Sequence, residues 1–254
     1  MEPVRPKKHL GQHFLKDENI ARKIVESVTF TDQILEIGAG TGVLTKYLVQ
    51  KPGKLKIIEI DAESVEYLKK RFSFPDDVLY FADFLRTDLS RIFQNEFAVI
   101  GNFPYNISSQ IFFKIIEYRH LIPEVVGMVQ KEVAERLAAR PGNKTYGILS
   151  VLLGVYYDIA LLFPVSEHVF VPPPKVKSAV IRLTRKTKKF PELDEKLFFG
   201  IVKTAFNQRR KTMRNSLRGY WEGLLNPEEF PVFKQRPEEL AVEEFIALTN
   251  LLKR

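Results

Sequence analysis

Residues 34–42 read Ile-Leu-Glu-Ile-Gly-Ala-Gly-Thr-Gly, an apolar run that passes into three closely spaced glycines. The apolar run predicts a buried β-strand, and the glycines predict a tight turn whose backbone can approach a ligand closely. A strand, a glycine turn and a helix in succession form the nucleotide-binding corner of open α/β sheets. Dinucleotide-binding proteins require the pattern G-x-G-x-x-G, but Val43 stands where its third glycine belongs. The pattern therefore disfavours a nicotinamide-dependent oxidoreductase, although such an enzyme would share this sheet.

The sequence around this turn, from about residue 30 to residue 130, alternates short apolar runs with segments of helical period. This alternation predicts βαβ units around a parallel sheet. The predicted strands cover residues 33–38, 55–61, 78–83, 97–102 and 125–130, and the predicted helices cover residues 43–50, 63–71, 108–118 and 131–139. An earlier helix is predicted to begin after Asp17, a favourable N-cap residue. A further helix follows Thr145, and β-rich runs at 159–165 and 176–184 predict a hairpin that closes the sheet.

A domain boundary is predicted near residue 187. The run 185–189 is basic and lacks apolar side chains, and the sequence after it has a helical period. The predicted fold class is α/β. We expect a Rossmann-like domain at residues 1–187, mostly parallel with a C-terminal antiparallel hairpin, and a small all-helical domain at residues 188–254. If one helix runs through the start of the second domain, it places Val202, Phe206, Met213 and Leu217 on one face.

The net charge of +8 favours a polyanionic partner, with nucleic acid ahead of a membrane surface, and a basic solvated surface is the alternative. Part of the positive charge lies in a stretch without acidic residues, which contains Lys203, Arg209, Arg210, Lys211, Arg214 and Arg218. A second basic cluster near the start of the chain contains Arg5, Lys7, Lys8 and Lys16. The two clusters are candidate phosphate contacts for one nucleic acid.

The composition excludes several kinds of chemistry. There is no cysteine, so disulfides, thiolate nucleophiles and cysteine metal sites are excluded, and His9, His120 and His168 lack metal-ligand spacing. We therefore expect no metal site. No apolar stretch approaches the ~20 residues of a membrane span, and the basic start of the chain lacks the apolar core of a signal peptide. We expect a cytoplasmic protein, with a monomer as the default state.

Two carboxylates stand at the ends of predicted strands. Glu59 ends the second strand, where a carboxylate can accept hydrogen bonds from both ribose hydroxyls of an adenosine-containing cofactor. Asp83 ends the third strand. Together with Gly38 and Gly40, this arrangement resembles the S-adenosylmethionine-dependent methyltransferases, and that resemblance implies that Asp83 pairs with the adenine amino group of the cofactor. The structural alternative is a plain glycine turn flanked by exposed strand-end charges.

The tetrapeptide Asn102-Phe103-Pro104-Tyr105 follows the fourth predicted strand and resembles the N/D-x-P-Y/F/W motif of amino-methylating enzymes. The lone pair of an adenine N6 is delocalised into the ring and is a poor nucleophile. Acceptors at the Asn102 side chain and the Phe103 carbonyl would favour a pyramidal nitrogen, while Tyr105 would stack on the base. Pro104 would hold the backbone. Phe170, next to Pro172–Pro174, could supply a second aromatic face, although a core position is the alternative for this side chain.

Nearly the whole chain resembles the small-subunit ribosomal RNA adenine dimethyltransferases. The segments that carry the likeness are the glycine turn and residues 7–15, 102–105, 170–175 and 206–217. The resemblance implies two methyl groups on each of two adjacent adenosines in a hairpin loop near the 3′ end of the RNA. It also implies that His13, Leu15 and Asn102 contact the cofactor. His13 stands where relatives generally carry asparagine, which leaves open whether that contact is retained.

Two other functions remain open from the sequence. A non-catalytic RNA-binding factor of ribosome assembly would keep the fold and lose the chemistry, against which the intact Asn102–Tyr105 and Glu59 argue. A DNA adenine methyltransferase would share the pocket but not the basic C-terminal part. The immature small ribosomal subunit is the expected partner, and S-adenosylmethionine is the expected cofactor.

Overall fold

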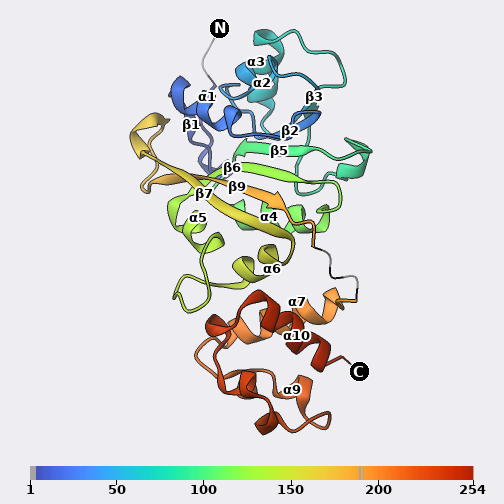
Figure 1. Ribbon diagram of the computed structural model, residues 1–254. Coiled ribbons are helices and arrows are strands. Elements are labelled where there is room, and N and C mark those ends of the chain that lie inside the picture. The colour runs from blue at the N-terminus through green and yellow to red at the C-terminus, as the bar shows by residue number, and fades with distance from the viewer. Residues whose placement is uncertain (1–3, 189, 191, 254) are drawn as a thin grey trace. The chain divides into compact units, whose positions relative to one another are not determined.

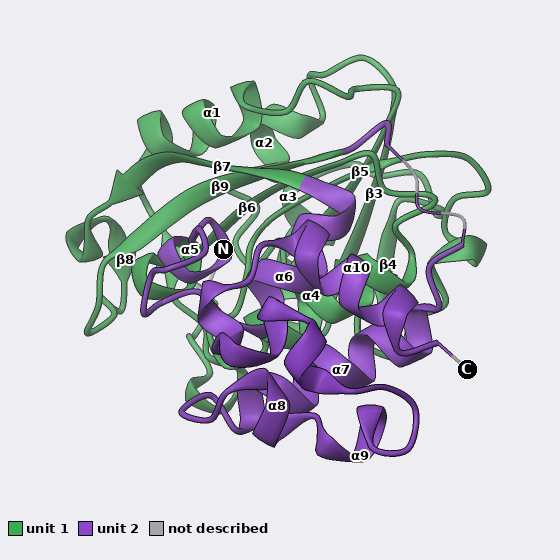
Figure 2. Ribbon diagram, turned by 60° about the horizontal axis from the view of Figure 1, so that its bottom comes forward, with its two compact units in different colours: residues 1–134, 158–185 green, residues 135–157, 186–254 purple. Residues whose placement is uncertain are grey.

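The chain groups into two compact units (Figure 2). Unit 1 spans Met1–Ala134 and Asp158–Arg185, and unit 2 spans Glu135–Tyr157 and Lys186–Arg254. The computed structural model describes residues 4–188, 190 and 192–253. Residues 135–157, which the sequence places in the first domain, thus group with the C-terminal part, because α6 (Ile148–Tyr156) packs against two helices of that part. The second segment of unit 2 begins at Lys186, next to the domain boundary predicted near residue 187.

Unit 1 is built around a seven-stranded sheet with the order β4-β3-β2-β5-β6-β9-β7 (Figure 1). The strands are β2 (Gln33–Ile37), β3 (Lys54–Glu59), β4 (Leu79–Phe81), β5 (Ala98–Asn102), β6 (Glu124–Gln130), β7 (Tyr157–Val165) and β9 (Ser178–Arg185). The pairs among β2 to β6 are parallel, and β9 pairs antiparallel with β6. The predicted α/β class with a mostly parallel sheet is confirmed.

The strand order creates a crevice at one edge of the sheet. The chain runs outward from β2 through β3 to β4 and then returns to β5 on the other side of β2. Ligands of open α/β sheets bind at such a switch point, beyond the carboxyl ends of the strands. The parallel register sets Ile37 beside Ile58, and Asn102 beside Met128. The residues that follow β2, β3, β4 and β5 therefore meet at this edge.

Helices cover both faces of the sheet in unit 1. They are α1 (Glu18–Glu26), α2 (Thr45–Leu48), α3 (Ala62–Arg71) and α4 (Ser108–Glu117), with α5 (Lys131–Leu137) directly after β6. Helices α1, α2 and α3 lie on one face and α4 on the other (Figure 1). Helix α1 begins as predicted, because the Asp17 carboxylate accepts hydrogen bonds from the backbone N–H groups of Asn19 and Ile20. Among the described residues, no helix is long and apolar enough to cross a bilayer.

A short second sheet joins distant parts of unit 1. Strand β1 (Phe14–Leu15) pairs antiparallel with β8 (Phe170–Val171). Neither strand was predicted, because two residues are too few to show a period. The pairing brings the N-terminal segment beside the proline-rich loop that follows β8.

The Glu124 carboxylate ties the loop after α1 to the start of β6. Although Glu124 is buried, its oxygens accept hydrogen bonds from the Thr29 backbone N–H (2.8 Å), the Thr29 hydroxyl (2.9 Å) and the Phe30 backbone N–H (2.7 Å). Replacing Glu124 by alanine leaves these donors without a partner. We expect a loss of about 3 kcal/mol in the free energy of unfolding, measured by urea denaturation. Glu117→Ala, an exposed position, should change it by less than about 0.5 kcal/mol, and equal effects would contradict the role.

Unit 2 is helical in its described part. Besides α6 it contains α7 (Glu195–Asn207), α8 (Met213–Ser216), α9 (Arg218–Trp221) and α10 (Val242–Leu251). The single helix considered for residues 202–217 is wrong, because α7 ends at Asn207 and α8 begins after Thr212. The side chains of Val202, Met213 and Leu217 are nevertheless all buried. Between the two helices the Lys211 backbone N–H donates to the Gln208 carbonyl, and the Met213 N–H at the start of α8 donates to the distant Gln235 carbonyl.

Candidate active site

A cavity opens at the carboxyl edge of the parallel strands. Nine residues predicted from the sequence line it, namely His13, Gly38, Gly40, Glu59, Asp83, Asn102, Phe103, Pro104 and Tyr105. They come from the N-terminal segment and from the ends of four strands. The tertiary structure thus brings together residues that lie up to 92 positions apart in the sequence (13 to 105).

Gly38 and Gly40 of the glycine turn both line the cavity, and the space around their Cα atoms differs. Gly38 has φ +68°, and a Cβ added to it would face open space. Gly40 has φ +54°, and a Cβ there would lie 2.8 Å from the Phe14 ring. Glycine is therefore needed at both positions for the left-handed backbone, and at Gly40 also for the close approach of the N-terminal segment. The open space at Gly38 is what a bound ligand requires.

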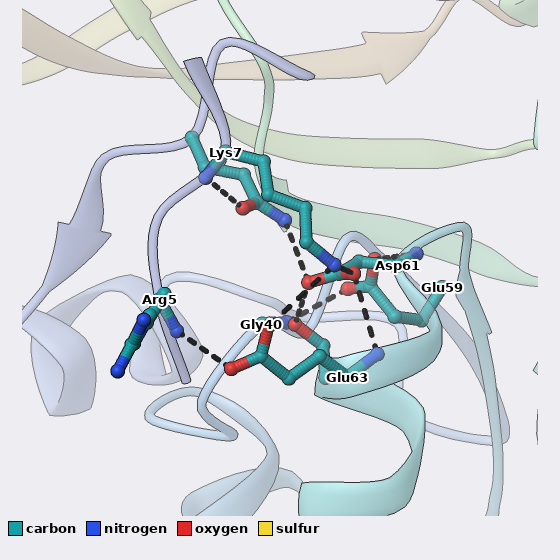
Figure 3. Close-up of polar contacts among 8 residues, drawn as sticks. Arg5, Lys7, Gly40, Glu59, Asp61 and Glu63 are labelled. Carbon is teal, nitrogen blue, oxygen red and sulfur yellow. Dashed lines mark hydrogen bonds and ion pairs between the residues drawn. The ribbon is translucent and has the colours of Figure 1, made fainter. Parts of the chain in front are cut away.

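Glu59 lies at the end of β3 with both carboxylate oxygens engaged by backbone. One oxygen accepts from the Gly40 N–H at 2.9 Å and the other from the Asp61 N–H at 2.8 Å (Figure 3). Burial raises the pKa of the carboxyl, and these backbone hydrogen bonds oppose the rise. Each oxygen retains a second lone pair, so the carboxylate can still accept hydrogen bonds from a ligand in the cavity.

Asp83 follows β4 on the same side of the cavity. Its Oδ1 accepts from the Leu85 backbone N–H at 2.9 Å, and its Oδ2 lies 3.5 Å from the Arg86 guanidinium. These contacts hold the carboxylate in place at the rim.

Glu36 is a buried carboxyl in β2, directly before the turn, and its Oε2 accepts from the Thr45 hydroxyl at 2.7 Å. Burial raises its pKa from 4.5 to about 8, and the Thr45 hydrogen bond opposes the rise. The folded chain thus binds this proton more tightly than the unfolded chain. The stabilising contribution of the protonated carboxyl is complete below pH 4.5, falls as the pH rises to about 8, and is lost above it.

The pH dependence can be measured against Glu36→Gln, which does not titrate. From about pH 5 to pH 8, the free energy of unfolding of the unmodified protein should fall by roughly a few kcal/mol relative to that of the variant. Urea denaturation across this range provides the measurement. A constant difference between the two proteins would show that Glu36 is ionised throughout.

Asn102 is the last residue of β5 and points its amide at the N-terminal segment. Its Nδ2 donates a hydrogen bond to the His13 carbonyl at 2.9 Å. A carbonyl accepts and does not donate, so this contact requires the nitrogen side of the amide. The Oδ1 of Asn102 is then the atom left to accept a hydrogen bond from a ligand.

Phe103 borders the cavity with its backbone. The ring is fully buried and rests against Gly127, where an added Cβ would lie 2.4 Å from it. The backbone N–H donates to the Met128 carbonyl at 3.0 Å, which fixes this peptide on the edge of β6. The ring is thus a core side chain, and the role predicted for the Phe103 carbonyl stays a prediction.

Tyr105 forms a wall of the cavity. Its hydroxyl hydrogen-bonds the Ser178 hydroxyl, and its ring stacks on the His13 ring with centroids 5.4 Å apart and planes inclined by 27°. Burial raises the pKa of the phenol, and the hydrogen bond with Ser178 opposes the rise. The His13 ring also contacts the Pro172 carbonyl through Nδ1 at 2.8 Å. Sequence reasoning did not single out Ser178, which carries no pattern of its own.

Leu15 and Phe170 do not line the cavity. They pair across β1 and β8, and both side chains are buried in the core cluster on the α1 face of the sheet. For Phe170 the structure favours the core alternative over an exposed stacking face. The predicted contact of Leu15 with a cofactor stays a prediction.

The N-terminal segment is held at the end of β3 by an acidic residue that sequence reasoning missed. Asp61 is buried and accepts hydrogen bonds from the side chains of Lys7, Gln12 and Ser64 (Figure 3). Burial raises the pKa of Asp61, but these hydrogen bonds outweigh it and hold the pKa below its usual value. The signal available was its place two residues after Glu59, at the N-cap of α3. Lys7, a predicted RNA contact, is thus engaged in an ion pair, whereas Lys8 is exposed.

The predicted RNA-binding residues of unit 2 differ in their environments. Arg209, Arg214 and Arg218 each form an ion pair with a glutamate, namely Glu238, Glu228 and Glu222. Lys203, Arg210 and Lys211 are exposed, and the Lys211 ammonium donates to the Gln208 side chain. Contact of all six with RNA stays a prediction.

Comparison with known proteins identifies the family. The model of the ribosomal RNA adenine dimethylase family matches residues 4–229. The chain belongs to this family. It is 55% identical to ribosomal RNA small subunit methyltransferase A of Cytophaga hutchinsonii, with 99% of each chain covered. It is also 54% identical to the protein of the same name from Flavobacterium johnsoniae, with 100% of this chain and 98% of the relative covered.

Solved structures of adenine and ribosomal RNA methyltransferases share the fold. A dimethyladenosine transferase from Plasmodium falciparum superposes with a TM-score of 0.78 at 27% identity, covering 93% of this chain and 96% of that one. The 23S rRNA methyltransferase ErmE superposes with a TM-score of 0.67 at 25% identity, covering 95% and 100%. The family's fold therefore extends over both units of the chain.

Proposed function

We propose that the protein transfers methyl groups from S-adenosylmethionine to N6 of adenosine in small-subunit ribosomal RNA during ribosome biogenesis. Two adjacent adenosines in a hairpin loop near the 3′ end would each receive two methyl groups. The observation that carries the proposal is that the Asn102–Tyr105 segment, the glycine turn and Glu59 line one and the same cavity. Membership of the ribosomal RNA adenine dimethylase family supports it.

The lining of the cavity fits S-adenosylmethionine. Glu59 would accept hydrogen bonds from the ribose hydroxyls, and Asp83 would accept one from the adenine amino group. The open space over Gly38 would admit the part of the cofactor that lies along the backbone of the glycine turn. His13 and Asn102 also line the cavity. When bound, the cofactor supplies a methyl group on a positively charged sulfur.

The protein's own groups would then act on the adenine. The Asn102 Oδ1 and the Phe103 carbonyl accept hydrogen bonds from the two N–H groups of N6, which draws its lone pair out of the ring and aims it at the methyl group. Tyr105 holds the unstacked base by its aromatic wall. A monomethylated nitrogen keeps one N–H for these acceptors, so a second round can follow.

We further propose how the RNA is held. The exposed Lys8, Lys203, Arg210 and Lys211 would contact phosphates, and the paired arginines Arg209, Arg214 and Arg218 would exchange glutamates for phosphates on binding. The proposal includes a cytoplasmic, monomeric protein that acts on immature small subunits.

The test is incubation with undermethylated small ribosomal subunits and methyl-labelled S-adenosylmethionine, followed by digestion of the RNA to nucleosides. N6,N6-dimethyladenosine is the expected labelled product. Parallel samples with DNA containing unmodified adenine should remain unlabelled, and labelled DNA would favour the DNA methyltransferase alternative. Tight binding to the subunits without label would favour a non-catalytic assembly factor.

A further inference from the structure

The N-terminal segment is anchored just after β3, on the other side of β2 from β5, which carries Asn102. The side chains of Lys7 and Gln12 both donate to the buried Asp61 carboxylate at the start of α3, and the Gln12 side chain also accepts from the Lys7 backbone N–H at 2.8 Å (Figure 3). The Arg5 backbone N–H donates to Glu63 at 2.9 Å. Among the contacts of this segment, those to Asp61 involve the most buried carboxylate, whose side chain is 1% exposed.

The residue that follows Gln12 contacts the reacting groups. His13 accepts the hydrogen bond from Asn102 through its backbone carbonyl and stacks its ring on Tyr105. Gln12 and His13 are consecutive, so a displacement of one moves the other. Asp61 is thereby linked to Asn102 through two neighbouring residues.

The link has a chemical consequence because an amide has two different ends. In one orientation Asn102 presents an oxygen acceptor to the substrate amino group, and in the flipped orientation it presents N–H donors, which cannot accept from N6. The His13 carbonyl attracts the nitrogen end and therefore selects the acceptor orientation. A shift of about 1 Å in such a positioning contact can cost on the order of 100-fold in rate.

We propose that Asp61 is a positioning residue that, through Gln12 and His13, holds the Asn102 amide in the orientation that accepts a hydrogen bond from the substrate. This inference rests on the proposed function. Asp61 itself does not need to touch the substrate, and its effect is predicted to appear in kcat more than in cofactor affinity.

The test measures kcat at saturating cofactor and RNA, together with the Kd of S-adenosylmethionine. Asp61→Asn should lower kcat by about 10- to 100-fold, and Gln12→Ala, which leaves the core intact, should lower it in the same direction. The matched control is Asp77→Asn, which removes another lysine–aspartate ion pair on an exposed side chain and should leave kcat unchanged. Thermal denaturation of each variant separates unfolding from loss of positioning.

The same substitutions made in an Asn102→Asp protein distinguish a loss of positioning from a general loss of structure. In Asn102→Asp both side-chain oxygens accept hydrogen bonds, so the orientation of the group no longer matters. Asp61→Asn and Gln12→Ala should then lower the kcat of Asn102→Asp, measured under the same saturating conditions, by less than about twofold. Equal losses in both backgrounds, or a change confined to the cofactor Kd, would overturn the positioning role. Inactivity of the unmodified protein would instead count against the proposed function.

Discussion

Asn102→Ala should lower kcat for methyl transfer to undermethylated small subunits by about 10³-fold, the order found when a positioned transition-state hydrogen bond is removed. The alanine removes the Oδ1 acceptor and leaves the Phe103 carbonyl alone to draw out the N6 lone pair. Because the adenine nitrogen is a poor nucleophile, the loss falls on the chemical step. Affinity for S-adenosylmethionine should fall by less than about tenfold, since the glycine turn and Glu59 remain.

Single-turnover transfer of labelled methyl groups and calorimetric titration of the cofactor measure these two quantities separately. Asn95→Ala is the matched control, because Asn95 is an exposed asparagine shortly before β5 and outside the cavity. If Asn102→Ala kept more than about a tenth of the activity, the proposed acceptor role would be refuted.

Glu59→Gln should raise the Kd for S-adenosylmethionine by about 10²-fold, because each charge-assisted hydrogen bond to a ribose hydroxyl contributes roughly 1.5–3 kcal/mol. The substitution also turns one carboxylate oxygen into an N–H donor that faces a backbone N–H, either that of Gly40 or that of Asp61. The glycine turn thus loses a hydrogen bond at the same time. Equilibrium titration of the cofactor measures the effect in the absence of RNA.

Glu66→Gln provides the comparison for this variant, since Glu66 is an exposed residue of α3 whose only ion pair among the described residues is with Lys69. Its Kd should match that of the unmodified protein. At saturating cofactor, Glu59→Gln should recover most of its kcat, because Glu59 acts on binding and not on the adenine. An unchanged Kd would contradict a ribose contact.

The strands and the candidate site tetrapeptide Asn102–Tyr105 were predictable from local pattern. The five parallel strands coincide with the predicted runs to within a few residues, because each contains a short apolar run that the sequence displays directly. Gly38, Glu59 and Asn102 were predictable as candidate site residues for the same reason, since each stands at the carboxyl end of such a strand. Strands β1 and β8 and the break between α7 and α8 were not predictable, because they depend on partners far away in the sequence.

The sequence by itself determined the order of the strands along the chain and the residues at their carboxyl ends, and hence which side chains are candidates for a ligand site. These features depend on residue type and short-range spacing, which need no knowledge of distant contacts. Only the tertiary structure decided that Phe170 and Leu15 are core residues, that Lys7 and Gln12 bind the buried Asp61, and that the His13 carbonyl orients Asn102. These positions depend on burial and hydrogen bonding between segments about 50 to 160 residues apart in the sequence. Contacts between such distant segments leave no local pattern in a single sequence.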